Sequence, residues 1–197
     1  LENQKFKYSP YRRDPESLVR YWAVPGQEGY THILGGLEKD GETGTISTDP
    51  ENHHLMDNLR FGKVARIHVP DLEVEGDAND ADLLIVGFGS TYGHLHAAMA
   101  ELRCRGHKVA LAQLKYINPL PANTAEVLTR YKKVVVAEQN LGQLAALLRI
   151  RINGFTPYQL DRVKGQPLRT HRIATIFENI ILDKIHANGD TFTSRIV

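Results

Sequence analysis

The chain has 197 residues, enough for one domain with an additional arm, and its formal net charge of +1 favours neither nucleic acid nor an anionic membrane as a partner. No apolar run approaches the roughly 18 residues of a membrane-spanning helix, and no signal-peptide pattern begins at Leu1. One cysteine, Cys104, excludes an internal disulfide and a cluster with about four cysteine ligands in this chain alone, and it favours a reducing cytoplasm.

Residues 1–50 predict an irregular arm. Turn dipeptides such as Pro25-Gly26 and Asp40-Gly41 recur there without helical or strand periodicity. The arm also contains aromatic side chains at a density that seldom stays exposed to water, among them Tyr8, Tyr11, Tyr21, Trp22 and Tyr30. We therefore expect the arm to pack either against the domain that follows or against a partner.

A helix is predicted from residue 50. Asp49 can cap it, Pro50 suits its first position, and Glu51 favours the positive end of the helix dipole. An apolar stripe follows at Leu55, Met56 and Leu59. Residues 71–80 then contain five acids and no base, which predicts a solvated linker or a short exposed hairpin.

From residue 82 onward, apolar runs typical of buried strands alternate with segments of helical periodicity. The predicted order is strand 83–86, helix 91–105, strand 108–114, helix 122–131, strand 134–136, helix 141–152, strand 158–160 and helix 170–185, with no clear element after Gly189. Strands that alternate with helices through short links form parallel βαβ units. The predicted fold class is therefore α/β, a three-layer sandwich with a mainly parallel sheet, preceded by the irregular arm.

The segment Gly87-Phe88-Gly89-Ser90-Thr91-Tyr92-Gly93 follows the first strand and opens a helix, where a phosphate could meet free backbone N–H groups. Its spacing is GxGxxxG, not the GxGxxG of a dinucleotide site, and no acid lies between Glu101 and Glu126 to bind the ribose of a nicotinamide cofactor. These differences disfavour NAD and favour a tight turn whose glycines allow close packing. A weak anion or partner contact stays open for Gly87, Gly89, Ser90 and Thr91.

Glu138, Asn140 and Gln143 follow the third predicted strand, at the carboxyl edge of a parallel sheet. Ligands and interfaces of α/β folds lie at this edge, so the three residues are candidates for either role. An equally good interpretation is structural, in which Asn140 caps the helix and Gln143 pairs back to the cap. The two interpretations are compatible.

No catalytic or metal-ligating set is predicted in this chain. His94 and His96 lie two positions apart, so on a helix their side chains point about 200° apart and cannot share one ion. Neither Cys-x-x-Cys nor His-Glu-x-x-His occurs. Cys104 lies on the first helix of the βαβ pattern and is predicted to be a semi-buried packing residue, not a nucleophile.

Several short motifs occur in an order that is specific, although each is weak alone: Pro10-Tyr11-Arg12-Arg13-Asp14, Trp22-Ala23-Val24-Pro25-Gly26, Gly35-Gly36-Leu37-Glu38, Asp49-Pro50-Glu51-Asn52-His53, Gly87-Phe88-Gly89-Ser90, Asn118-Pro119-Leu120-Pro121 and Glu138-Gln139-Asn140-Leu141-Gly142-Gln143. Over nearly the whole chain they resemble the C-terminal part of the alpha subunit of 2-oxoacid:ferredoxin oxidoreductases, most closely the 2-oxoglutarate type. Because the sequence begins at Leu1 without an initiator methionine, we expect it to be a fragment of such a subunit.

The resemblance implies an enzyme that decarboxylates a 2-oxoacid on thiamine diphosphate, passes electrons through an iron–sulfur cluster to ferredoxin and releases an acyl-CoA. It implies that residues 1–66 are a connector arm and helix leaving the thiamine-binding domain, and that residues 67–197 are similar to the transketolase C-terminal domain. Thiamine diphosphate, Mg²⁺ and the cluster would lie mainly on the beta subunit, so this chain alone would bind no cofactor and would serve assembly of a cytoplasmic oligomer. The alternative is a nucleotide- or CoA-binding α/β module that uses the Gly87–Gly93 turn.

Overall fold

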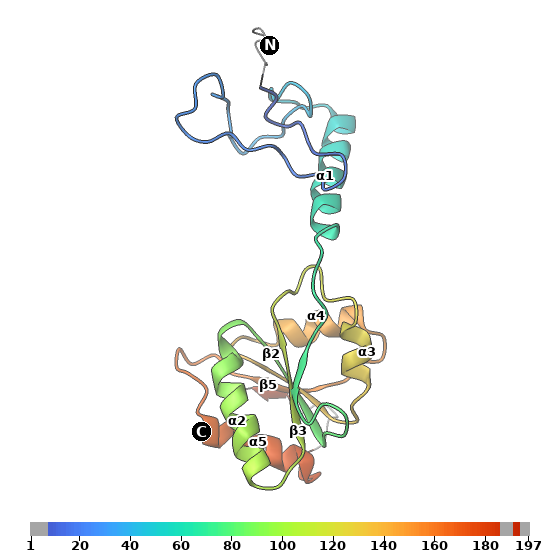
Figure 1. Ribbon diagram of the computed structural model, residues 1–197, viewed down its shortest axis with the longest axis vertical. Helices are drawn as coiled ribbons and strands as arrows, with labels where there is room; N and C mark the ends of the chain where they lie inside the picture. Colours follow the sequence, from blue (N-terminus) through green and yellow to red (C-terminus); the bar gives the residue numbers. More distant parts are fainter. Residues whose placement is uncertain (1–7, 186–190, 194–197) are drawn as a thin grey trace, which may run out of the picture. The chain divides into compact units, whose positions relative to one another are not determined.

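The computed structural model describes residues 8–185 and 191–193 (Figure 1). The chain divides into two compact units, with the boundary between His68 and Val69. In the described part of the chain, no helix combines the length and the apolar character needed to cross a bilayer.

The first unit begins with turns in place of regular elements. The carboxylates of Asp14 and Asp40 each accept hydrogen bonds from the backbone N–H groups two and three residues further on, at distances of 2.7 to 3.1 Å. Each turn is closed by a single antiparallel bridge, Arg13 with Arg20 and Lys39 with Ile46. The expectation of an arm without regular elements is thus confirmed for residues 8–49.

Helix α1 (Pro50–Ala65) starts where the sequence predicts, because the Asp49 carboxylate accepts from the N–H groups of Glu51 and Asn52 at 3.3 and 3.2 Å. The preceding turn is attached to this helix through Glu38, which accepts two hydrogen bonds from Arg60 at 3.1 and 2.9 Å. This pairing with Arg60 lowers the pKa of Glu38 to about 2.

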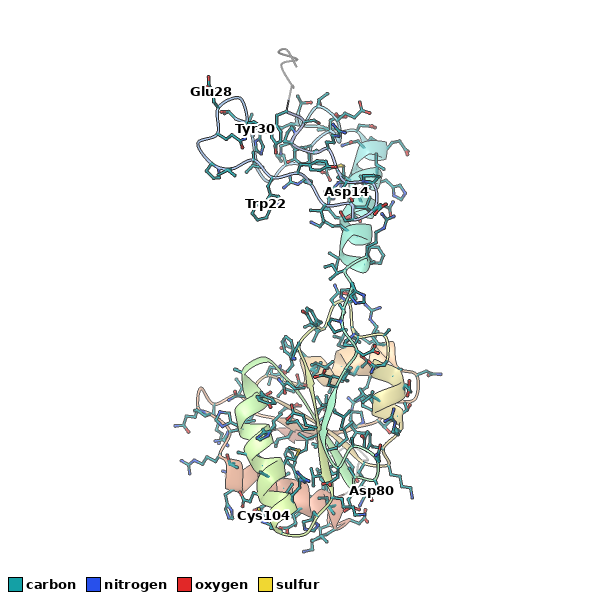
Figure 2. The ribbon with its side chains drawn as sticks, viewed as in Figure 1. Asp14, Trp22, Glu28, Tyr30, Asp80 and Cys104 are labelled. Atoms are coloured by element: carbon teal, nitrogen blue, oxygen red, sulfur yellow. The ribbon has the colours of Figure 1, made fainter. Side chains whose placement is uncertain are left out.

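Aromatic rings of the first unit contact one another and nearby cations. The ring centroids of Tyr8 and Tyr30 lie 4.9 Å apart, and the guanidinium of Arg20 lies 4.8 Å from the centre of the Tyr11 ring. Trp22, in contrast, is 89% exposed (Figure 2). Other large apolar side chains of the same segment are exposed with it: Val24, Ile33, Leu34, Leu37 and Ile46.

The second unit contains a six-stranded sheet with the order β1-β3-β2-β4-β5-β6. Its strands are β1 (Val74–Gly76), β2 (Leu83–Phe88), β3 (Val109–Leu114), β4 (Val134–Glu138), β5 (Tyr158–Asp161) and β6 (Thr191–Thr193). All neighbouring pairs are parallel except β1 with β3, which is antiparallel. The fold class is confirmed as α/β with a mainly parallel sheet.

The two edge strands differ from the sequence-based expectations. Part of the acidic segment 71–80 forms β1, which pairs with β3 and is not half of a local hairpin. Beyond Gly189, where no element was expected, β6 pairs in parallel with β5. Each edge strand has three residues and one neighbour, so neither carries the apolar pattern of a strand buried on both faces.

Two helices cover each face of the sheet, as the predicted three-layer arrangement requires (Figure 1). Helices α2 (Tyr92–Cys104) and α5 (Thr170–Ile181) pack over Leu83 and Ile85 of β2. Helices α3 (Thr124–Thr129) and α4 (Gln143–Arg151) pack over Leu84 and Val86 on the opposite face. Alternate residues of β2 therefore enter two different cores, which explains its continuous apolar run.

The chain order creates a crevice at the carboxyl edge of the sheet. From β2 the chain passes through α2 to β3 on one side, and from β4 it passes through α4 to β5 on the other side. Because β2 and β4 are neighbours, their following loops leave in opposite directions. Open α/β sheets bind ligands at such a topological switch point.

Candidate functional site

Both segments singled out from the sequence lie at this carboxyl edge. Gly87 to Thr91 end β2 and form the 3-10 turn Gly89–Thr91, and Glu138 to Gln143 end β4 and open α4. The register that pairs Val86 with Val136 brings the two segments beside each other. The structure therefore places all seven candidate residues on one edge of the sheet.

Three of the four candidates after β2 have structural roles. A Cβ atom on Gly87 would lie 2.4 Å from Cδ1 of Leu95 and 2.6 Å from Oε1 of Gln113, so any other residue would have to displace these side chains. Gly89 has a φ of +63°, which favours glycine. The buried Thr91 donates its hydroxyl to the carbonyl of Phe88 at 2.9 Å.

Ser90 is the candidate after β2 that is left for an outside contact. It is exposed, and it lines a cleft of about 550 Å³ with the loop that follows β5. Ser90 is thus the candidate after β2 that lines this opening, and its contact with an anion or a partner stays a prediction.

Glu138 closes the start of helix α4 from inside the protein. Its buried carboxylate accepts from the backbone N–H of Leu144 at 2.7 Å and of Ala145 at 2.9 Å. Helix starts leave such N–H groups without intrahelical partners, and a carboxylate also suits the positive end of the helix dipole. Glu138 is therefore committed to a structural role.

Asn140 supports the same helix start from outside. Its side-chain oxygen accepts from the N–H groups of Gly142 and Gln143 at 2.8 and 3.0 Å, and Gly142 adopts a φ of +86°. The N-cap position is Gly142, so Asn140 is not the N-cap that was predicted: it closes the turn before the helix and accepts from the first helical residue, Gln143. Gln143 is exposed and makes no side-chain hydrogen bond to the helix start within residues 8–185, so its predicted pairing is wrong. Glu138 instead supplies the other acceptor for the helix start, because it accepts from the N–H of Leu144.

Asp161 is a buried acid that the sequence analysis missed. It ends β5, pairs in register with Glu138, and has an Oδ1 atom without a hydrogen-bond partner. Burial, followed by the charge of Glu138, raises the pKa of Asp161 to about 6, against the opposite effect of Arg149. The position of Asp161 directly after a predicted strand could have marked it as a candidate. Its burial could not be predicted in the same way, because it depends on the pairing of β5 with β4.

Replacing Asp161 with asparagine should stabilise the protein at neutral pH. A raised folded-state pKa means that the ionised form opposes folding, so removing the charge should increase the free energy of unfolding by about 1–2 kcal/mol after screening by solvent. The difference should shrink as the pH falls from about 6 to 3.8, because wild-type Asp161 then becomes neutral in the folded protein. Urea denaturation across this pH range measures the effect.

The exposed Asp71 provides the matched control, since Asp71→Asn removes a surface carboxylate of the same unit. It should show no comparable pH-dependent difference in stability. A constant or inverted difference for Asp161→Asn would contradict the assignment of a raised pKa.

Two openings of different chemistry lie near this edge. The first is the cleft at Ser90, whose wall contains Arg162 and Lys164 and no carboxylate. The second, of about 770 Å³, lies beside β1 and β3 and is lined by acids and aromatic rings, including Asp71, Glu73, Glu75, Phe88, Tyr92 and Tyr116. The cleft at Ser90 is thus lined by basic side chains, whereas the opening beside β1 and β3 is lined by several acidic ones.

In the part of the chain that the structure describes, no three His, Cys, Asp or Glu side chains come together as a metal-binding group. Cys104 is exposed at the last residue of α2 (Figure 2), so the predicted semi-buried packing role is wrong. The buried stripe of α2 ends at Leu102, and a residue two positions further on points away from that stripe.

The chain is similar to several known proteins. Residues 81–174 match the family model described as pyruvate:ferredoxin oxidoreductase core domain II. The 2-oxoglutarate oxidoreductase subunit KorA of Mycobacterium tuberculosis is 54% identical over 142 residues, which are 72% of this chain and 22% of that protein. Subunit alpha of 2-oxoacid:ferredoxin oxidoreductase 2 of Aeropyrum pernix is 33% identical over 158 residues, which are 77% of this chain and 24% of that protein.

A solved structure agrees with these sequence matches. The 2-oxoglutarate:ferredoxin oxidoreductase of Magnetococcus marinus, with 2-oxoglutarate, coenzyme A and succinyl-CoA bound, has a TM-score of 0.74 and 32% identity, and the match covers 91% of this chain and 32% of that one. The chain thus spans 22% to 32% of the length of these three relatives. The resemblance seen in the order of the motifs is confirmed: the chain belongs to the family of 2-oxoacid:ferredoxin oxidoreductase alpha subunits.

Proposed function

We propose that the chain is an assembly portion of the alpha subunit of a 2-oxoglutarate:ferredoxin oxidoreductase. The whole enzyme would decarboxylate the 2-oxoacid oxidatively, form an acyl-CoA and pass electrons to ferredoxin. Two of the similar proteins, from Mycobacterium tuberculosis and Magnetococcus marinus, are named for 2-oxoglutarate, which supports this substrate.

We also propose a division of labour between the subunits. The described residues include no group of three metal-binding side chains. As the similarity to alpha subunits of multi-subunit enzymes suggests, thiamine diphosphate, Mg²⁺ and an iron–sulfur cluster would be held elsewhere in a cytoplasmic oligomer, mainly on the beta subunit. Residues 1–66 would be the connector from the thiamine-binding domain, and residues 67–197 a domain similar to the transketolase C-terminal domain. Calorimetric titration of this chain alone with thiamine diphosphate and Mg²⁺ should show no tight binding; a tight complex would overturn the division.

The exposed apolar side chains of the first unit are the observation that carries the assembly role. Trp22 is 89% exposed, and Ile33, Leu34 and Leu37 are each exposed by 65% or more. Trp22 and Leu34 line one opening of the arm. Exposed apolar surface of this kind marks protein interfaces, and tryptophan is enriched among the residues that dominate binding. We assign these side chains to contacts with the beta subunit, and the carboxyl edge of the sheet to further subunit contacts.

Replacing Trp22 and Leu34 together with serine in the whole alpha subunit should weaken its binding to the beta subunit by about tenfold or more, as expected when an exposed aromatic anchor is lost. The dissociation constant is measured with purified subunits by calorimetry. Ile150→Ser is the matched control, because Ile150 is 80% exposed on α4 and lies outside the arm. Equal affinities for the Trp22/Leu34 variant and the control would contradict the assignment.

A second candidate function is the binding of a nucleotide or a CoA-like anion. The single observation in its favour is the cleft of about 550 Å³ at Ser90, whose wall contains basic side chains. The Thr91 hydroxyl is already bonded to the carbonyl of Phe88, so it is not a free donor for such an anion.

A further inference from the structure

The cleft at Ser90 lies where three loops of the second unit meet. Its lining comes from the turn and helix after β2, from Gln139 after β4, and from the loop between β5 and α5. We name it the Arg162 cleft and define it by Ser90, His94, Gln139, Arg162, Lys164 and Pro167. The β2 and β4 loops that border it are the two that diverge at the switch point of the sheet.

The charge of the Arg162 cleft is one-sided. Arg162 and Lys164 line it together with the imidazole of His94, and no carboxylate is among its lining residues. Neither cation forms an ion pair with any residue in the described ranges 8–185 and 191–193. Other cations of this unit, such as Arg103 and Lys108, are paired with aspartates. Within the described residues, the cleft therefore brings two cations without an ion-pair partner together at one opening.

Arg162 carries the sharpest indication of a missing partner. Its Nε atom is buried and has no hydrogen-bond acceptor within the part of the chain that the structure describes. A buried donor without an acceptor is unfavourable, so Arg162, which also lines the cleft, leaves part of its guanidinium unsatisfied within the described residues. A guanidinium also matches the planar pair of oxygens on a phosphate group.

The size and the walls of the cleft fit a small molecule. A volume of about 550 Å³ lies within the roughly 300–1,000 Å³ typical of small-molecule sites. Ser90 adds a hydroxyl beside the first turn of α2, whose positive dipole end favours negative charge. Val163 and Pro167 provide apolar contact for an organic part of the ligand.

We propose that the Arg162 cleft binds the phosphate groups of a small phosphorylated molecule, with Arg162 and Lys164 as the principal donors. This inference deepens the second candidate function, because it moves the anion contact from the glycine turn to the loop after β5. The neighbouring acidic pocket, with Asp71, Glu73 and Glu75, would repel the same ligand. The ligand is therefore expected in one of the two openings only.

The test is a titration of the 197-residue chain with pyrophosphate, ADP and adenosine in separate experiments. Binding is monitored through the backbone amide resonances in NMR spectra. Pyrophosphate and ADP should shift the resonances of Ser90, His94 and Lys164, and adenosine should not. Arg162→Gln should raise the dissociation constant of pyrophosphate about tenfold or more, and Lys164→Gln by about threefold to tenfold, since each removes a charge-assisted contact.

Two variants control for the loss of one positive charge. Arg172→Gln and Lys132→Gln change cations of the same unit that do not line the cleft, and they should leave the dissociation constant unchanged. Lys164→Gln changes an exposed side chain, so it keeps the test decisive if Arg162→Gln impairs folding.

Three results would overturn the proposal: no resonance shifts at millimolar pyrophosphate, shifts confined to residues outside the cleft, or equal weakening by the control variants. The Trp22/Leu34 double variant should bind pyrophosphate as the wild type does. Failure of the cleft proposal and failure of the assembly proposal can therefore be told apart.

Discussion

Replacing Glu138 with alanine should lower the free energy of unfolding by about 2–4 kcal/mol, because two buried N–H groups at the start of α4 lose their acceptor and a cavity remains. The carboxylate accepts from Leu144 and Ala145 at 2.7 and 2.9 Å, within the layer that α4 forms over β4. Relief of the repulsion between Glu138 and Asp161 returns only part of this loss. Urea denaturation at neutral pH measures the change.

Asn140→Ala provides the comparison for Glu138→Ala, since Asn140 supports the same helix from the outer, partly exposed side. Loss of the turn hydrogen bonds that Asn140 accepts should cost about 0.5–1.5 kcal/mol. Glu138→Gln provides a second measurement, the pKa of Asp161. Because this variant removes the charge of Glu138, the pKa of Asp161 should fall below about 6. A loss for Glu138→Ala no larger than that for Asn140→Ala would contradict the buried-cap role.

Replacing Gly87 with valine should destabilise the second unit by about 3 kcal/mol or more, because overpacking of a filled core forces its neighbours apart. Even a single Cβ at this position would approach Leu95 to 2.4 Å and Gln113 to 2.6 Å, and Leu95 is fully buried. The steric conflict lies between β2 and α2, so the whole layer over that face should be affected. Thermal and urea unfolding give the measurement.

Gly93→Ala is the matched control for Gly87→Val, within the same glycine motif. A Cβ on Gly93 meets no atom within 4 Å, and the residue lies in α2. Alanine there should therefore raise the stability by about 0.5 kcal/mol through helix propensity. Changes of the same sign in both variants would contradict the distinction between a packing glycine and a free one.

The sequence was most informative where local chemistry decides the structure. Asp49 and Pro50 marked the start of α1, and the apolar run 83–86 marked a strand that is buried on both faces. Alternation of such runs with helical periodicity was enough to predict a parallel three-layer fold. These features depend on residues that are close in sequence, so their pattern is visible without the fold.

The features that escaped prediction depend on residues that are distant in sequence. Asp161 is buried only because β5 pairs with β4, and Glu138 reaches the N–H of Ala145 seven residues further on. The cations of the Arg162 cleft come close to Ser90 only through the order of the strands. No periodicity or spacing encodes such encounters, which explains why the site was predicted less completely than the fold.

Strand β1 has a consequence for how copies of this domain can associate. It covers the outer side of β3 with three residues, carries Glu75, and ends at Gly76 with a φ of +85°, where a Cβ would meet the carbonyl of Val109 at 2.5 Å. A short, charged and sharply ending border strand is a poor template for another chain. Continuous β-sheet growth from molecule to molecule is thereby blocked on this side, and association is directed to side-chain surfaces.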